Sequence, residues 1–431
     1  MNAPPAHVPP GWLGSATHRA WLDAHARDLL RFFRATLQPD GHFVELDDDG
    51  RPMPTGCPPS GAARQQLLTV ARAVHSYSLG EILGVPGCGP IVERGLAAIW
   101  REHRDTSAGG YRSAVGAHEP ADGERLAYDH AFVLLAASSA RAAGHASADQ
   151  IYDDVLSVID EHFWSEDSGA SAEAFDGEWE ELEAYRGANS NMHLCEAFLA
   201  ASAVSGDAGL ARRAVRIAEL LIDGHARRNG WLLPEHYDRE WQPRFQYNLE
   251  KPDDPFRPYG ATIGHLLEWS RLLLCAWIET GQRDEWLPGA ARELFTRAVG
   301  TGWDTARGGL VYTVGWDAAP VDDDHYWWPV AEAIGASSYL ARLTGDASYE
   351  RWYQRFWDFA ATHLIDHQRG GWYAQLDRDN RRTVHPWYGK PDLYHALQAC
   401  LLPAYEPAGS AAAALLAGPA PVAAAGKAWT R

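Results

Sequence analysis

Three histidines stand at like positions in three separate helical stretches. His193, His265 and His395 each lie in the first turns of an apolar stretch, a few residues after a glycine or a proline. An imidazole with a pKa near 6.5 can accept and return a proton close to neutral pH, which is the condition for efficient acid–base catalysis. The pattern therefore predicts that the three histidines meet at one catalytic site.

Other polar side chains interrupt the same kind of apolar stretch. Glu268 lies three residues after His265 and so on the same helix face, where its carboxylate would fix the imidazole tautomer and raise its basicity. An arginine and a tyrosine beside such histidines suit proton transfer next to a carbonyl group. The further candidates, expected to bind the substrate, are Arg72, Tyr128, Asn189, Arg257, Trp328, Glu332 and Gln398.

Zinc binding is the alternative use of three histidines, because imidazole is a common zinc ligand. The three share no HxxxH or HExxH spacing, since each comes from a separate helical stretch. We therefore expect no metal at this site.

Long amphipathic helices must position these residues, and strands are almost absent from the pattern. Apolar residues recur at i, i+3, i+4 and i+7 over twelve stretches. The stretches are residues 17–37, 60–84, 89–103, 122–144, 147–163, 187–205, 207–228, 258–280, 284–300, 323–344, 346–366 and 388–405. Turn-like motifs with glycines at 41, 110, 169, 230, 309 and 371 recur about 60 to 80 residues apart. Such a repeat predicts six helical hairpins, and their length favours a closed all-α (α/α)6 toroid over an open solenoid.

Alternate helices differ in composition. Those that begin near 60, 122, 187, 258, 323 and 388 are rich in alanine, leucine and serine, which predicts an inner ring, and the others carry charge on one face. Residues 1–405 are expected to form a single barrel domain. Residues 406–431 are biased toward alanine, proline and glycine and are expected to be a flexible tail, with room for a short helix at 411–416.

The composition excludes several classes of function. A formal net charge of −19 argues against binding nucleic acid or anionic lipid, because both need a basic face. The longest apolar runs are far shorter than the roughly 20 residues of a membrane span. Five single cysteines and the absence of a visible secretory signal favour reduced thiols in a cytoplasmic protein. A monomer and a homo-oligomer are equally compatible with the sequence.

On these motifs, the chain resembles the N-acylglucosamine 2-epimerase superfamily along about residues 15–405. The matching segments are VARAVHSYS with Arg72, YDHAFVLL with Tyr128, GANSNMHLCEAFL with Asn189 and His193, RPYGATIGHLLEWSRLL with Arg257, His265 and Glu268, and KPDLYHALQA with His395. The resemblance implies an (α/α)6 barrel that acts on a monosaccharide without metal or organic cofactor. Gln398 stands where the 2-epimerases usually carry arginine. In this feature the chain resembles the aldose–ketose isomerases of the superfamily. Leu68 stands where many relatives carry a tryptophan.

The resemblance implies isomerisation through a cis-enediol, with D-mannose and D-fructose as the expected pair. His395 would move the proton between C2 and C1, and His265, oriented by Glu268, would be the partner acid–base. Arg72 would hold the enediolate oxygens together with Tyr128 and Asn189. His193, counted among the catalytic histidines, and Arg257 would anchor the remaining hydroxyls.

Four alternatives stay open. Within the same superfamily, they are a sulfoquinovose isomerase, in which Arg257 would receive the sulfonate, and a sugar 2-epimerase. A toroidal glycoside hydrolase would need two carboxylates, for which Glu268, Glu332 and Asp392 are available. A toroid that binds sugar without catalysis is the fourth.

Overall fold

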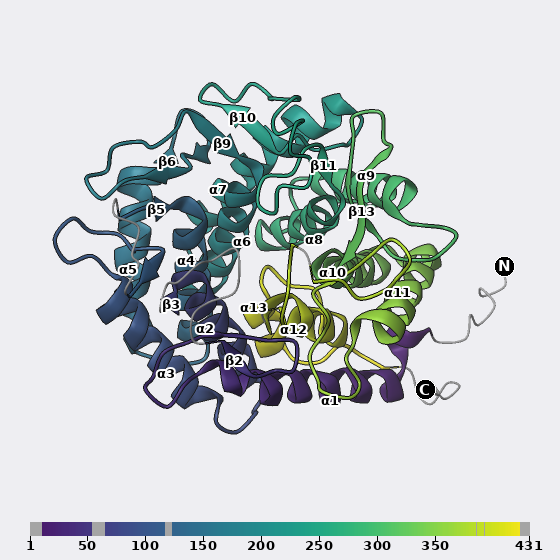
Figure 1. Cartoon of the computed structure of the whole chain (residues 1–431), viewed down its shortest axis with the longest axis horizontal. Coiled ribbons are helices and arrows are strands. Elements are labelled where there is room, and N and C mark those ends of the chain that lie inside the picture. Colours follow the sequence, from purple (N-terminus) through teal and green to yellow (C-terminus); the bar gives the residue numbers. More distant parts are fainter. Residues whose placement is uncertain (1–10, 54–64, 117–122, 385, 392, 423–431) are drawn as a thin grey trace.

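Two concentric rings of helices form the computed structural model, which describes residues 11–53, 65–116, 123–384, 386–391 and 393–422 (Figure 1). The inner helices are α2 (Leu67–Ile82), α4 (Ala127–Ala142), α6 (Ala188–Ser205), α8 (Ile263–Glu279), α10 (Trp327–Thr344) and α12 (Leu393–Leu401). The outer helices are α1 (Ala16–Phe32), α3 (Cys88–Ala98), α5 (Ser147–Val158), α7 (Ala208–Ala218), α9 (Trp286–Gly302) and α11 (Ala347–Phe359). Each inner helix packs on the next, and α12 packs on both α2 and α1, so the ring is closed. The predicted (α/α)6 toroid is confirmed.

Burial separates the two rings as the composition predicts. Almost every residue of α4 is buried, because this helix has neighbours all round. Helix α11 buries only one face, through Tyr349, Tyr353, Phe356 and Trp357. Four outer helices continue into π-helical turns: Ile99–His103, Ile159–Phe163, Glu219–Ala226 and Ala360–Leu364. Short 3₁₀ segments are Trp12–Gly14, Phe33–Thr36, Arg227–Asn229 and Leu402–Ala404.

Short antiparallel strands lead into five of the inner helices, a feature that the sequence pattern did not reveal. Paired strands are β3 (Gln65–Gln66) with β4 (Ala114–Val115), β5 (Arg125–Leu126) with β8 (Ala174–Phe175), and β9 (Tyr185–Gly187) with β10 (His236–Asp238). A four-stranded sheet runs β11 (Ala261–Thr262), β12 (Val311–Val314), β13 (Pro320–Tyr326), β14 (Gln375–Leu376). Two hairpins, β1 (Glu45–Leu46) with β2 (Pro52–Met53) and β6 (Trp164–Ser165) with β7 (Ala170–Ser171), complete the set. Most of these strands are too short for the alternation that marks a strand in sequence.

The recurring glycines turn the chain back after each outer helix. All six adopt positive φ angles, from 62° at Gly230 to 95° at Gly309, a region that other residues rarely enter. At Gly309, a Cβ atom would also lie 2.6 Å from Nδ1 of His325. These turns aim each chain segment back toward the start of an inner helix.

Part of the C-terminal tail belongs to the barrel. Helix α13 (Ala411–Ala417) packs against α2, α4, α6 and α12 and lies near the axis of the ring in Figure 1. Ala412, Ala414 and Leu415 are buried. The short helix expected at 411–416 therefore exists, and the expectation of a flexible tail does not hold for these residues.

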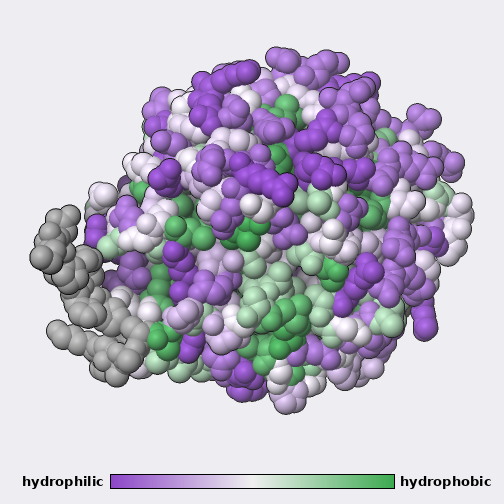
Figure 2. Space-filling model, turned by 180° about the vertical axis from the view of Figure 1, so that it is seen from behind, coloured by the Kyte–Doolittle hydropathy of each residue, from purple (hydrophilic) through white to green (hydrophobic). Residues whose placement is uncertain are grey.

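One face of the molecule, opposite the view of Figure 1, is mostly polar. The face in Figure 2 is largely hydrophilic, with hydrophobic residues gathered below its centre. Within the described residues, no helix is long and apolar enough to cross a bilayer. Cys88, Cys195, Cys275 and Cys400 are buried free thiols, and Cys57 lies outside the described residues.

Candidate active site

A cavity of about 750 Å³ opens where the inner helices begin. Its volume is in the usual range for small-molecule sites. Nine expected site residues line it together: Arg72, Tyr128, Asn189, His193, Arg257, His265, Glu268, Trp328 and His395. Leu68, Trp327 and Trp387 add apolar wall. The helices that carry the chemistry therefore converge on one cavity.

His395 is held by a buried glutamate. Its Nδ1 lies 2.8 Å from Oε1 of Glu332, whose side chain is 2% exposed. Burial opposes ionisation of Glu332, but Arg271 and His395 together lower its pKa below the usual value. Because a carboxylate only accepts hydrogen bonds, Nδ1 carries the proton and Nε2 keeps its lone pair. Glu332 does not line the cavity, so the prediction that it binds substrate is replaced by a role behind His395.

His265 has the same arrangement with a residue that the sequence did not single out. Its Nδ1 lies 3.0 Å from Oε1 of Glu235, which is also buried. The backbone N–H of Thr262 donates to the same oxygen at 3.3 Å. The expectation that Glu268 orients His265 is therefore wrong. Glu235 lies 30 residues earlier in the chain, in the LLPEHYD segment, where a glutamate between apolar residues was the available signal.

Trp328 lies between the two histidines. Its ring centroid is 5.1 Å from that of His265 and 5.8 Å from that of His395. Gly264 makes room for it, because a Cβ atom there would lie 2.3 Å from Cζ3 of the tryptophan. The two His–Glu pairs and the indole ring thus form one wall of the cavity.

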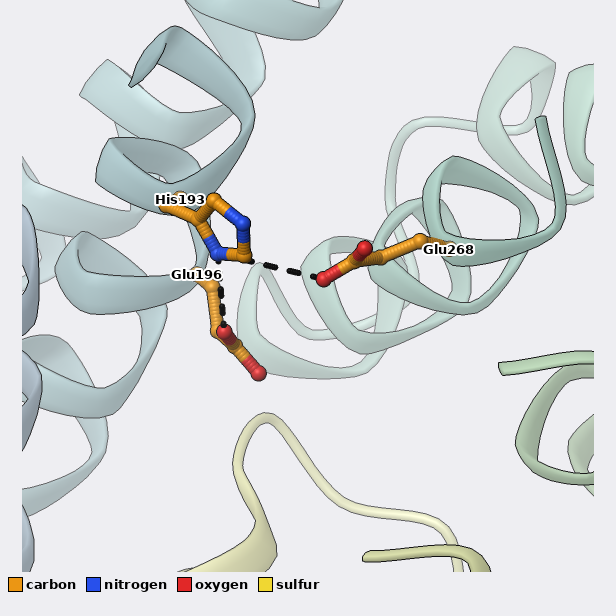
Figure 3. Close-up of side chains that lie close together, drawn as sticks. All are labelled: His193, Glu196 and Glu268. Carbon is orange, nitrogen blue, oxygen red and sulfur yellow. Dashed lines mark ion pairs between the residues drawn. The ribbon is translucent and has the colours of Figure 1, made fainter. Parts of the chain in front are cut away.

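Glu268 points toward His193 on α6 (Figure 3). Its Oε1 lies 3.9 Å from Nδ1 of His193 and 3.7 Å from Nη2 of Arg271, and neither carboxyl oxygen has a hydrogen-bond partner within the structure. Burial, and next the charge of Glu332, raise the pKa of Glu268 well above its usual value. Burial lowers the pKa of His193 to about 4. Burial thus favours the protonated form of Glu268 and the neutral imidazole of His193.

His193, Glu196 and Glu268 form the one group in the described residues close enough to hold a metal ion, with ligand atoms within 4.8 Å of one another (Figure 3). The guanidinium of Arg271 lies 3.4 Å from Glu196 and 3.7 Å from Glu268. A divalent cation here would face this buried positive charge and would have to deprotonate Glu268. The group fits a metal ion poorly, and metal independence stays a prediction.

The opposite side of the cavity offers hydrogen-bond donors. Arg72 on α2 donates from Nη2 to the hydroxyl of Tyr128 on α4 at 2.9 Å, and its guanidinium lies 4.6 Å from the ring centroid of Phe132. Asn189, at the start of α6, has a buried Oδ1 with no hydrogen-bond partner in the described structure. This side can receive the oxygens of a polar ligand while the histidines face its carbon atoms.

Arg257 is already paired at the cavity edge. It donates to both carboxylate oxygens of Glu183, at 3.0 Å and 2.5 Å, and to the hydroxyl of Tyr247 at 3.2 Å. Four other carboxyl side chains line the cavity: Glu45, Glu124, Asp129 and Glu173. Burial raises the pKa of Asp129 to about 6. The wall is thus better suited to hydroxyl groups than to an anion.

Gln398 does not reach the cavity. Its side chain is buried, and Nε2 has no hydrogen-bond partner within the described structure. The prediction that Gln398 contacts substrate is therefore not supported by its position. Asp392 lies outside the described residues.

Comparison with known proteins agrees with this geometry. The chain is 42% identical to a D-mannose isomerase of Thermobifida fusca over 94% of its own length and 98% of that protein. It is 41% identical to a D-mannose isomerase of Pseudomonas cannabina pv. alisalensis, covering 95% of this chain and 98% of the relative. The crystal structure of a D-mannose isomerase superposes with a TM-score of 0.82 at 28% identity, covering 93% and 99% of the two chains. A cellobiose 2-epimerase from Spirochaeta thermophila shares the fold, with a TM-score of 0.75 at 19% identity over 89% and 95%. Residues 41–399 match the family model of N-acylglucosamine 2-epimerases, and the chain belongs to this family.

Proposed function

We propose that this chain is an aldose–ketose isomerase that interconverts D-mannose and D-fructose. The observation that carries the proposal is the pair of histidines on one cavity wall, each bound through Nδ1 to a buried glutamate. Each imidazole thereby keeps a basic Nε2 for the substrate. The two curated relatives, at 41% and 42% identity over nearly the whole chain, support mannose as the aldose.

Ring opening is the first step. His265 takes the proton from the O1 hydroxyl, the C1–O5 bond breaks, and the ring oxygen receives a proton from Glu268. The raised pKa of Glu268 supports this role, because only a protonated carboxyl can donate. The product is the open-chain aldehyde with its C2 proton made acidic by the neighbouring carbonyl.

Proton transfer between C2 and C1 follows. Nε2 of His395 removes the C2 proton, and the electron pair moves to O1 to give the cis-enediolate. Arg72 and Tyr128 stabilise the charge on oxygen, as fixed donors do where charge develops. His395 then returns its proton to C1 while His265 relays the proton of O2 to O1, which gives the ketose.

The cavity supports a neutral sugar over a sulfonated one. Arg257, the candidate receptor for a sulfonate, is paired with Glu183. The remaining carboxyl groups on the wall would repel an anion, which disfavours it further. A glycoside hydrolase is less well supported, because Glu332, one of the carboxylates expected for it, lies behind the wall and not on it.

Two further properties belong to the proposal. The buried free thiols fit a reducing compartment, so we place the protein in the cytoplasm. The position of the Arg271 guanidinium next to Glu196 and Glu268 supports catalysis without a metal ion.

Product analysis tests the function. The purified protein is incubated with a panel of neutral and sulfonated hexoses, and the products are read by NMR. Fructose formed from mannose is the expected result. Formation of glucose without any ketose would identify a 2-epimerase, and a much higher kcat/KM for sulfoquinovose would reverse the order of substrates. Failure to convert any sugar would refute the proposal.

A further inference from the structure

Arg271 is a buried arginine that no step above uses. It lies on α8, 3% exposed, and does not line the substrate cavity. Its Nε lies 3.0 Å from Oε2 of Glu332 on α10, and its Nη2 lies 3.4 Å from Oε1 of Glu196 on α6. The guanidinium of Arg271 therefore joins carboxylates from α6 and α10, the inner helices on either side of α8.

We propose that Arg271 is a positioning residue for catalysis, which holds Glu332 ionised and in place so that His395 acts as the base. This inference rests on the proposed isomerase function. The chain of contacts is direct: Arg271 binds one oxygen of Glu332, and the other oxygen of Glu332 binds Nδ1 of His395. Arg271 thus acts on the substrate only through the imidazole.

The charges around this chain of contacts explain why it needs a cation. Around Glu332 and His395 lie Arg271 and Glu268 on α8, Glu196 and His193 on α6, and Tyr394 on α12. Arg72 on α2 acts on Glu268 and His193 in turn. Burial opposes ionisation of Glu196 and Glu332, yet Arg271 contributes to a lowered pKa for both. Glu268, farther from the guanidinium, has a raised pKa. Arg271 therefore favours the ionised form of two neighbouring carboxyl groups, while burial favours the protonated form of the third, Glu268.

The surroundings hold the guanidinium at a defined position. A Cβ atom at Gly335 on α10 would lie 3.2 Å from Cδ of Arg271, so only glycine leaves the side chain its full room. Arg271 and residues 409–412, before and within α13, line a small cavity that is separate from the substrate cavity. With little solvent there, neighbouring carboxylates depend on Arg271 for their charge.

Removal of the Arg271 charge should shift the pH dependence of kcat in a predictable direction. Without Arg271, the Glu332–His395 pair binds a proton more tightly, because its negative charge loses its partner. His395 is then protonated, and so inactive as a base, up to a higher pH. The acid limb of the kcat–pH profile therefore moves to higher pH. A purely structural role would lower the yield of folded enzyme or Tm without moving this limb.

The experiment compares Arg271→Met, which removes the charge, with Arg271→Lys, which keeps it. For Arg271→Met, we expect kcat at pH 7 to fall on the order of 10²-fold, as for misplaced catalytic groups, with KM little changed and the acid limb shifted upward. Arg271→Lys should keep the wild-type position of the limb. Unchanged kcat and an unchanged limb in folded Arg271→Met would overturn the proposal.

Two further measurements keep the test decisive. If Arg271→Met does not fold, Arg271→Lys is measured both alone and together with Glu332→Gln. If Arg271 acts through Glu332, the lysine substitution should cost little further kcat in the Glu332→Gln variant. Losses of kcat that are fully additive would refute action through Glu332. If the wild-type protein isomerises no sugar, the proposed function fails by itself. NMR titration of His395 in wild type and Arg271→Met then still decides, with an upward shift expected and an unchanged titration contradicting the role of Arg271.

Discussion

Gly264→Ala should damage catalysis through Trp328 while leaving the helix intact. The added Cβ would lie 2.3 Å from Cζ3 and 2.5 Å from Cη2 of the indole ring. Carbon atoms in contact prefer about 3.5–4.0 Å, so the ring must move by more than about 1 Å. Trp328 packs against both His265 and His395, so this movement reaches both acid–base groups. A misplacement of this size can cost on the order of 10²-fold in rate.

The assay separates this effect from stability. Gly264 lies in the first turn of α8, where alanine is at least as good a helix former as glycine, so Tm need not fall if the ring can move. Gly300→Ala on outer helix α9 is the matched control, because a Cβ atom there meets nothing within 4 Å. We expect kcat/KM to fall for Gly264→Ala and to stay at the wild-type value for Gly300→Ala. Wild-type kcat/KM in folded Gly264→Ala would refute the assigned role of Trp328.

Three other predictions concern the proton-transfer groups and the metal. His395→Asn should lower kcat roughly 10²–10⁴-fold while mannose still binds, as measured by turnover and by calorimetric titration; near-normal turnover would make His265 the first candidate for the base. Glu268→Gln should abolish ring opening. Burial raises the pKa of Glu268 and so favours the acid, and wild-type kcat should fall as pH rises through that pKa. Any residual activity of the glutamine variant should lack this limb. Exhaustive chelation should leave activity unchanged, and recovery of a lost activity on adding zinc or manganese would contradict a metal-free mechanism.

The sequence predicts the ring because the ring is built from local patterns. Helical periodicity and the turn glycines repeat within each hairpin, and both are set by neighbouring residues. The expected helix at 258–280 begins too early, because the two-residue strand β11 precedes α8. In the described part of the expected helix at 60–84, strand β3 likewise precedes α2, and residues 60–64 lie outside the described residues. Strands this short are stabilised by partners far along the chain, which periodicity does not show.

The site was predictable in its membership and less so in its contacts. Nine of the expected residues meet at the cavity, because each starts an inner helix or precedes one. The predicted partner of His265 was wrong. The i, i+3 rule points to Glu268, whereas Glu235 reaches the imidazole from a loop. The contact between Arg271 and Glu332 was likewise hidden, because it joins two helices whose relative rotation no local pattern fixes.

Isomerisation of mannose in deuterated water tests the central claim most directly. If His395 transfers the proton between C2 and C1, NMR should show fructose as the product, with any incorporated deuterium at C1. A single base that serves both carbons from one side of a planar enediol gives this result. Glucose that accumulates first, with deuterium at C2 and without ketose, would contradict it.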